Sequence, residues 1–143
     1  MNLHITYSDA KELSGFTNIN VMKGKEEYTQ ELDSVPTSSC NKVIISEALQ
    51  LIRSDEAMDV LSKSISKLRI KGTINATVSD FDRICTDFLS GNLKLEQLNN
   101  YLPNLNSVIA LPEVRKLLAQ RNIDVEKIEP REYFLVFNGV RLA

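Results

Sequence analysis

The sequence predicts an α/β fold with an open, mostly parallel β-sheet and an antiparallel strand at its C-terminal edge. A β-branched run at residues 42–46, an amphipathic segment and a Thr-, Ile- and Val-rich stretch at residues 73–79 indicate a β-α-β unit. Its connection is long enough to cross over to a parallel neighbour. Strand and helix patterns alternate elsewhere, and two apolar segments near the end, residues 123–128 and 133–137, indicate a strand pair.

The helix of this central unit is predicted to begin at Ser54 and to end at Gly72. Ser54 is a favourable N-cap, and two acidic residues follow it in the first turn. Basic residues gather before Gly72, where they complement the carbonyl end of the helix, and glycine adopts the left-handed conformation that ends one. Apolar side chains repeat at helical spacing and predict the buried face: Met58, Leu61, Ile65 and Leu68.

Composition and length limit the class of protein. The 143 residues are 43% hydrophobic, so residues 1–143 are expected to form one domain with its own core. The 17 basic and 19 acidic residues give a formal net charge of −2 and no electrostatic footprint for nucleic acid or an anionic membrane. Cys40 and Cys85 lack metal-ligand spacing and are interpreted as buried thiols, so no metal is expected. No apolar run approaches the about 20 residues needed to span a bilayer, and the N-terminus lacks a basic region followed by an apolar one, so a cytoplasmic protein is expected.

The N-terminal third is predicted to hold two strands and a long loop. Residues 3–7 alternate between apolar and polar side chains, which is typical of a strand. Gly15 then marks a turn before a second short strand at residues 16–21. Residues 23–39 are polar and contain Pro36, so they are predicted to be mostly loop, with a weak strand signal at residues 28–32.

The C-terminal half is predicted to hold three helices before its strand pair. Asp80 is expected to cap a helix over residues 81–89, and a short helix follows over residues 93–102. Residues 103–112 are interpreted as a linker, and a third helix is expected from Leu111, with proline in its first turn. The first of these helices is predicted to face inward with Phe81, Ile84, Cys85 and Phe88.

The strand pair ends the chain. Glu129 to Glu132 separates its members, and Asn138-Gly139 is a further turn signal. The apolar residues 133–137 are interpreted either as a buried strand or as a subunit contact, because an apolar strand on an edge would pair with another chain.

Four segments resemble motifs of one family. FTNINV (residues 16–21) is similar to a G-Y-x-N-I-D second strand, and QELDSVP (residues 30–36) is similar to an A-D-L-x-x-L-P loop. KVIISEALQLI (residues 42–52) is similar to D-x-I-x-x-x-x-V-L-E-H-I, and SKLRIKGTI (residues 66–74) to x-x-L-K-P-G-G-x-L. On these segments the chain resembles the compact class I S-adenosylmethionine-dependent methyltransferases of bacterial and phage genomes. This resemblance implies a Rossmann-like three-layer sandwich and S-adenosylmethionine as the cofactor.

The chain departs from the family at two cofactor motifs. The family's first strand runs into a glycine-rich turn of the L-G-C-G kind, where the missing side chains let the backbone approach the cofactor. Residues 6–10, TYSDA, contain no glycine. An acidic residue at the end of the second strand would bind both ribose hydroxyls, but Val21 stands there. The cofactor motif is therefore interpreted as degenerate.

Two arguments indicate the candidate site. One is the resemblance, and the other is the rule that open α/β sheets bind ligands at the carboxyl ends of their strands. Glu31 matches the loop acid that faces adenine in the family, and Ser46 and Glu47 match motif residues that line the mouth for cofactor and substrate. The sheet rule adds Ser79 and Asp80 as residues at the same edge. No catalytic residue is identified. The predicted cofactor-binding residues are Tyr7, Ser8, Val21, Glu31, Ser46 and Glu47.

Several of these residues also have plain structural interpretations. A solvated loop carboxylate is favoured for Glu31, because surface acids are common. Glu47 as a catalytic base would need a positioned proton donor, which the sequence does not show. His4 lacks a partner at ligand or triad spacing, so a structural histidine is favoured. Asp80 and Asp82 are interpreted as acids at a helix start rather than as a carboxylate pair.

The resemblance, the two departures from it and the charge balance leave three candidate functions. The first is a methyltransferase-like domain with a degraded cofactor site that acts mainly as a binding or structural subunit, with a protein partner or a second copy. The second is an active S-adenosylmethionine-dependent methyltransferase with an atypical nucleotide loop, which works by orienting the methyl acceptor. The third, a nucleic-acid-binding module, is disfavoured by the charge balance.

Overall fold

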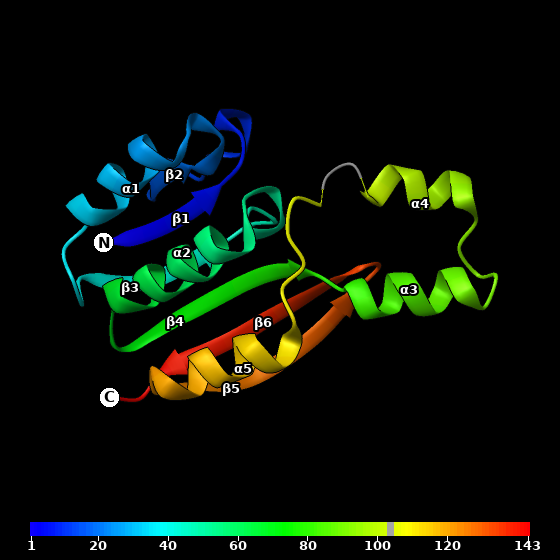
Figure 1. Ribbon diagram of the computed structural model, residues 1–143. Helices are drawn as coiled ribbons and strands as arrows, with labels where there is room; N and C mark the ends of the chain where they lie inside the picture. Colours follow the sequence, from blue (N-terminus) through cyan, green and yellow to red (C-terminus); the bar gives the residue numbers. More distant parts are fainter. Residues whose placement is uncertain (103–104) are drawn as a thin grey trace.

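A six-stranded, mostly parallel sheet organises the computed structural model, which describes residues 1–102 and 105–143 (Figure 1). Its strand order is β2-β1-β3-β4-β6-β5, and β6 pairs antiparallel with both of its neighbours, β4 and β5. The predicted Rossmann-like α/β fold with an antiparallel edge is confirmed. The strands are β1 (Asn2–Thr6), β2 (Thr17–Asn20), β3 (Cys40–Ile45), β4 (Leu68–Ser79), β5 (Ile123–Arg131) and β6 (Phe134–Arg141).

Three helices pack on one face of this sheet: α1 (Lys25–Ser34), α2 (Ser54–Lys67) and α5 (Leu111–Gln120). Two more, α3 (Phe81–Leu89) and α4 (Leu95–Tyr101), extend past the carboxyl end of β4 and form an arm at the right of Figure 1. Within the described ranges, no helix has the length and apolar character that crossing a membrane requires. The described residues also include the short 3-10 helices η1 (Asp9–Lys11), η2 (Val21–Lys23) and η3 (Leu49–Leu51).

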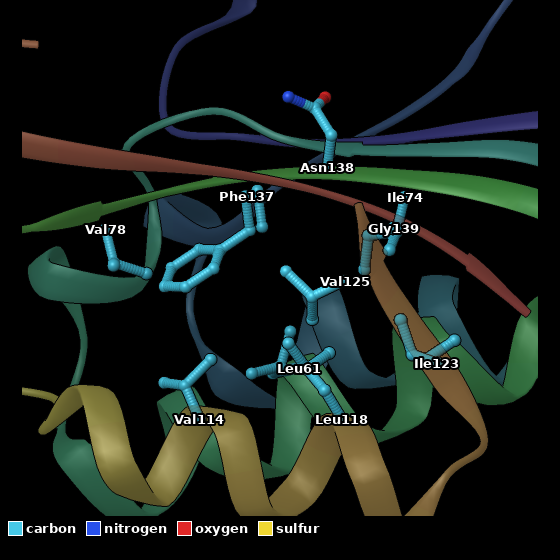
Figure 2. A pocket seen from close by; sticks show the side chains of 11 residues that line it. Leu61, Ile74, Val78, Val114, Leu118, Ile123, Val125, Phe137, Asn138 and Gly139 are labelled. Carbon is cyan, nitrogen blue, oxygen red and sulfur yellow. The ribbon is translucent and has the colours of Figure 1, made fainter. Parts of the chain in front are cut away.

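The hydrophobic core lies between the sheet and these three helices. Figure 2 shows Phe137 pointing toward Val114 and Leu118 of α5, with Leu61 of α2 beside them. The gap among these side chains is only about 10 Å³, too small for a ligand. The interior is therefore closed, and ligand sites have to be sought at the sheet's edges. Fully or nearly fully buried strand residues supply the floor of this core: Leu3, Ile5, Val43, Ile45, Ile74 and Phe137.

The opposite face of the sheet is polar. The strand register places Asn18, His4, Ile44, Asn75 and Asn138 in one row across five strands. Asn75 Nδ2 donates to Asn138 Oδ1 at 2.7 Å, and Figure 2 shows Asn138 pointing away from the helices. At the other end of this row the ring of Phe16, in the connection between β1 and β2, meets the His4 ring edge to face at 6.4 Å between centroids. The polar row thus leads to the part of the sheet where the candidate site was expected.

Two predicted segments differ from the structure near the centre of the chain. Residues 23–39 are not mostly loop, and residues 28–32 are not a strand, because α1 occupies them; its buried residues, Tyr28 and Leu32, stand four apart on one helical face. The central helix ends at Lys67 instead of Gly72, and β4 starts at once. Its N-cap is Arg53, one residue before the predicted Ser54.

Two glycines have different roles from those predicted. Gly72 lies within β4, where an added Cβ would stand 2.9 Å from the Arg69 carbonyl oxygen, so close backbone approach requires glycine there. Lys71 beside it takes the left-handed conformation, with φ of 66°. Asn138-Gly139 is not a turn, because both residues lie inside β6 and pair with β4.

The helix predicted over residues 81–89 is confirmed, including its cap: Asp80 Oδ1 accepts a hydrogen bond from the Arg83 amide at 3.2 Å. Of its predicted inward stripe only Ile84 is buried, because this helix belongs to the arm and has little of the sheet beneath it. The helix predicted over residues 93–102 is the shorter α4. Part of the predicted linker, residues 103–104, lies outside the described residues.

Tyr28 joins α1 to α2. Its side chain is buried, and its hydroxyl donates to Glu56 Oε2 at 3.3 Å. Burial, followed by the charge and hydrogen bond of Glu56, raises the pKa of Tyr28 from 10.0 to about 12. The neutral phenol is therefore favoured in the folded protein relative to the unfolded chain.

Replacement of Tyr28 by Phe tests this linkage. A raised folded-state pKa contributes stability that is complete below pH 10 and is lost as the pH rises toward 12. Between these limits the free energy of unfolding of the natural protein should fall more steeply than that of Tyr28→Phe, by up to about 1.4 kcal/mol per pH unit. Urea unfolding from pH 8 to pH 11 measures both slopes, and equal slopes would contradict the assigned pKa.

Gly139→Ala tests the close contact between β5 and β6. The new Cβ would stand 2.7 Å from Ile123 Cγ2 and 3.0 Å from the Asp124 carbonyl oxygen. We expect a loss of about 1–3 kcal/mol in the free energy of unfolding, because the backbone oxygen cannot move aside cheaply. Thr73→Ala, at an exposed position of neighbouring β4, is the control and should change it by less than about 0.5 kcal/mol. Equal stability of the two variants would refute the contact.

Candidate functional site

An open cavity of about 300 Å³ lies at the carboxyl end of the parallel strands. The end of β1 and the chain after it, the end of β3, and β4 all contribute to its wall. Three of the predicted cofactor-binding residues, Tyr7, Ser46 and Glu47, meet in it. The full lining is His4, Tyr7, Lys11, Leu13, Ser46, Glu47 and Thr77.

His4 is the centre of a hydrogen-bonded chain in this wall. Its ring is 1% exposed, and both nitrogens have a partner: Nδ1 lies 2.8 Å from Asn18 Oδ1, and Nε2 lies 2.9 Å from Ser46 Oγ. A buried imidazole with both nitrogens satisfied is held in one orientation. From the sequence a structural role was favoured for His4, because these partners are 14 and 42 residues away. No local spacing signals them, since strand register brings them together.

The direction of these hydrogen bonds follows from Asn18. Its Nδ2 donates to the carbonyl oxygens of Leu13 and Phe16, at 3.0 and 3.1 Å, which fixes the orientation of the amide. Asn18 Oδ1 therefore accepts, and the proton of the neutral His4 ring is on Nδ1. His4 Nε2 is then the acceptor for the Ser46 hydroxyl.

The connection from β1 to β2 uses its backbone amides internally. It contains the three-residue η1 as its helical element, and Ser8 caps this turn: its Oγ accepts from the Ala10 amide at 3.2 Å. The Ser8 carbonyl oxygen accepts from the Lys11 amide at 3.0 Å. The Leu13 amide donates to Asn18 Oδ1 at 3.0 Å. Ser8 thus holds the turn together, while its neighbour Tyr7 lines the cavity.

Val21 lies elsewhere, at the end of β2. It is 2% exposed and lines a second open hollow of about 410 Å³, together with Tyr28 and Glu56. The side chain of Asn20, the residue before it, forms two hydrogen bonds within the protein. Its Oδ1 accepts from the Met22 amide at 2.9 Å, and its Nδ2 donates to Asp9 Oδ1 at 3.1 Å. The end of β2 therefore presents an apolar side chain and an occupied amide.

The remaining predicted residues are spread over the edge. Glu31 lies on α1, not in a loop, with its carboxylate 3.8 Å from Lys23 Nζ, and it lines neither the 300 Å³ cavity nor the hollow at Val21. Ser79 and Asp80 line a third, smaller cavity of about 110 Å³ beside α5. Glu47 is not in a helix: it stands between β3 and η3 with φ of 47°. The structure brings only Tyr7, Ser46 and Glu47 together.

Comparison with known proteins rests on structure. Neither a protein-family model nor a curated protein matches this sequence. A SAM-dependent methyltransferase from Archaeoglobus fulgidus superposes with a TM-score of 0.63 and 12% identity, over 97% of this chain and 85% of that chain. An O-methyltransferase family protein from Burkholderia thailandensis gives 0.61 and 13% identity over 99% of this chain, which spans only 43% of its length.

A third similar structure holds a cofactor product. The 1,6-didemethyltoxoflavin-N1-methyltransferase of Burkholderia thailandensis, with bound 1,6-didemethyltoxoflavin and S-adenosylhomocysteine, gives a TM-score of 0.60 and 11% identity, over 99% of this chain and 71% of that chain. Identities this low describe the fold and leave the chemistry open. The fold of this chain is therefore the fold of the S-adenosylmethionine-dependent methyltransferases.

Proposed function

We propose that this chain is a methyltransferase-like domain with a degraded S-adenosylmethionine site, and that it acts mainly as a binding or structural subunit. The observation that carries the proposal is the closed turn after β1. A cofactor cradle at this edge needs free backbone amides and no intervening side chains. Here the amides of Ala10 and Leu13 already donate to side chains of the chain itself.

The end of β2 supports the same proposal. A carboxylate there would accept hydrogen bonds from both ribose hydroxyls. Val21 supplies no acceptor from its side chain, and the Asn20 amide is held by Met22 and Asp9. The residues in the turn after β1 and at the end of β2 thus do not fit the cofactor that the fold implies.

A binding role is supported by the arm of α3 and α4. Its base is anchored, because the Tyr133 hydroxyl donates to Asp87 at 2.9 Å and the Tyr101 and Tyr133 rings meet edge to face at 4.9 Å. Its tip carries apolar side chains in water: Leu89 is 84% exposed and Leu95 60%. Exposed leucines on an anchored arm are typical of a surface that another protein chain covers.

One observation favours the alternative of an active methyltransferase. Tyr7, Ser46 and Glu47 line one open cavity of about 300 Å³ at the edge where open α/β sheets bind ligands. An active enzyme of this kind would bind the cofactor or the methyl acceptor in this cavity without a glycine-rich turn. Ligand binding separates the two functions.

Calorimetric titration of the protein with S-adenosylmethionine and S-adenosylhomocysteine tests the proposal. We expect no binding heat up to about 1 mM ligand, where even a weak complex of about −4 kcal/mol would be half formed. The midpoint of thermal unfolding should likewise stay unchanged, because only a ligand that binds the native state raises it. Micromolar, one-to-one binding that Ser46→Ala or Glu31→Ala weakens would overturn the proposal in favour of the active enzyme.

A further inference from the structure

We propose that Ser46, His4 and Asn18 form a hydrolytic site for short-chain carboxylic esters, in which Ser46 is the nucleophile, His4 the general base and Asn18 a positioning residue. This activity requires no S-adenosylmethionine and goes beyond the binding role proposed above. It rests on the geometry of the three side chains, on the backbone around Ser46 and on the cavity in front of it.

The three side chains have the distances and hydrogen-bond directions that nucleophilic catalysis requires. A nucleophile and its base should lie about 2.6–3.2 Å apart, with a third group orienting the base. Ser46 Oγ is 2.9 Å from His4 Nε2, and Asn18 Oδ1 is 2.8 Å from His4 Nδ1. Because Asn18 accepts the Nδ1 proton, the Nε2 lone pair faces the serine hydroxyl.

The backbone places Ser46 in the wall of the cavity. Ser46 follows the last residue of β3 and is half buried, so its hydroxyl stands at the end of a rigid strand. Glu47 after it has φ of 47°, a conformation that non-glycine residues adopt rarely and that is frequent next to active sites. Ser46 and Glu47 both line the cavity.

The cavity suits a small acyl group. Its volume of about 300 Å³ lies at the lower end of the range for small-molecule sites. Leu13 gives it an apolar wall for a short alkyl chain, and Lys11 gives a positive charge for the oxygen that becomes negative during attack. The titratable groups that share this cavity with His4 are Tyr7, Lys11 and Glu47.

The reaction has two balanced steps. Ser46 Oγ bonds to the ester carbonyl carbon and its proton passes to His4 Nε2; the bond to the leaving oxygen then breaks, and that oxygen takes the proton from Nε2. Water next attacks the acyl-serine and gives a proton to His4 Nε2. The bond between the acyl carbon and Ser46 Oγ breaks, Oγ recovers this proton, and a carboxylic acid leaves.

Acylation by p-nitrophenyl acetate tests the proposal on the whole chain. We expect a burst of about one p-nitrophenol per protein, with the acetyl group found on Ser46 by mass spectrometry of peptides. Ser46→Ala should lose the burst and slow p-nitrophenol release by about 100-fold. Ser90→Ala is the matched control: this exposed hydroxyl donates to the Asp87 carbonyl oxygen and does not line the cavity, so the variant should keep the burst. Circular dichroism checks that both variants are folded.

Asn18→Asp tests the positioning role. A carboxylate beside Nδ1 stabilises the protonated ring, so the pH at which half of the acylation rate is reached should rise by about 1 unit. A residue that only supports the fold would change the rate at every pH and leave this midpoint in place.

Acetylation confined to lysine side chains, or a burst that Ser46→Ala retains, would overturn the proposal. So would an unchanged midpoint in folded Asn18→Asp. None of these outcomes depends on S-adenosylmethionine. The experiments therefore test the proposed hydrolytic site independently of the proposed loss of the cofactor site.

Discussion

A buried histidine joins the three parallel strands at one end of the sheet. His4 in β1 bonds to Asn18 of β2 and to Ser46 at the end of β3, and Asn18 in turn holds the β1–β2 connection by the Leu13 and Phe16 carbonyl oxygens. Buried polar groups are costly unless they are hydrogen-bonded, so each of these side chains depends on the others. This corner sets the position of the connection, the shape of the 300 Å³ cavity and the surroundings of Ser46.

The core that determines the fold lies apart from the carboxyl edge of the sheet. The order of strands is set by hydrophobic burial on the helix-covered face, where Leu3, Ile5, Val43 and Phe137 lie. The polar face and the carboxyl edge contribute little to that core. The turn after β1 is a capped 3-10 turn whose residues are not buried, so it can differ from other turns without disturbing the core of the sheet.

Local pattern predicted most of the fold and little of the site. The strands at residues 42–46 and 73–79 and the helix over residues 81–89 were predictable, because their periodicity and caps lie within a few residues. Helix α1 was missed, since only Tyr28 and Leu32 mark its buried face among polar neighbours. The partners of His4 could not be predicted, because they depend on which strands pair and in which register.

The proton on the His4 ring tests this account most directly. His4 is the one histidine of the chain, so a long-range proton–nitrogen correlation spectrum reports on it without ambiguity. At a pH where the ring is neutral, we expect the proton on Nδ1, donated to Asn18, and an unprotonated Nε2 that accepts from Ser46. A proton on Nε2 would contradict it, because Asn18 would then not orient the ring and Ser46 would have no base.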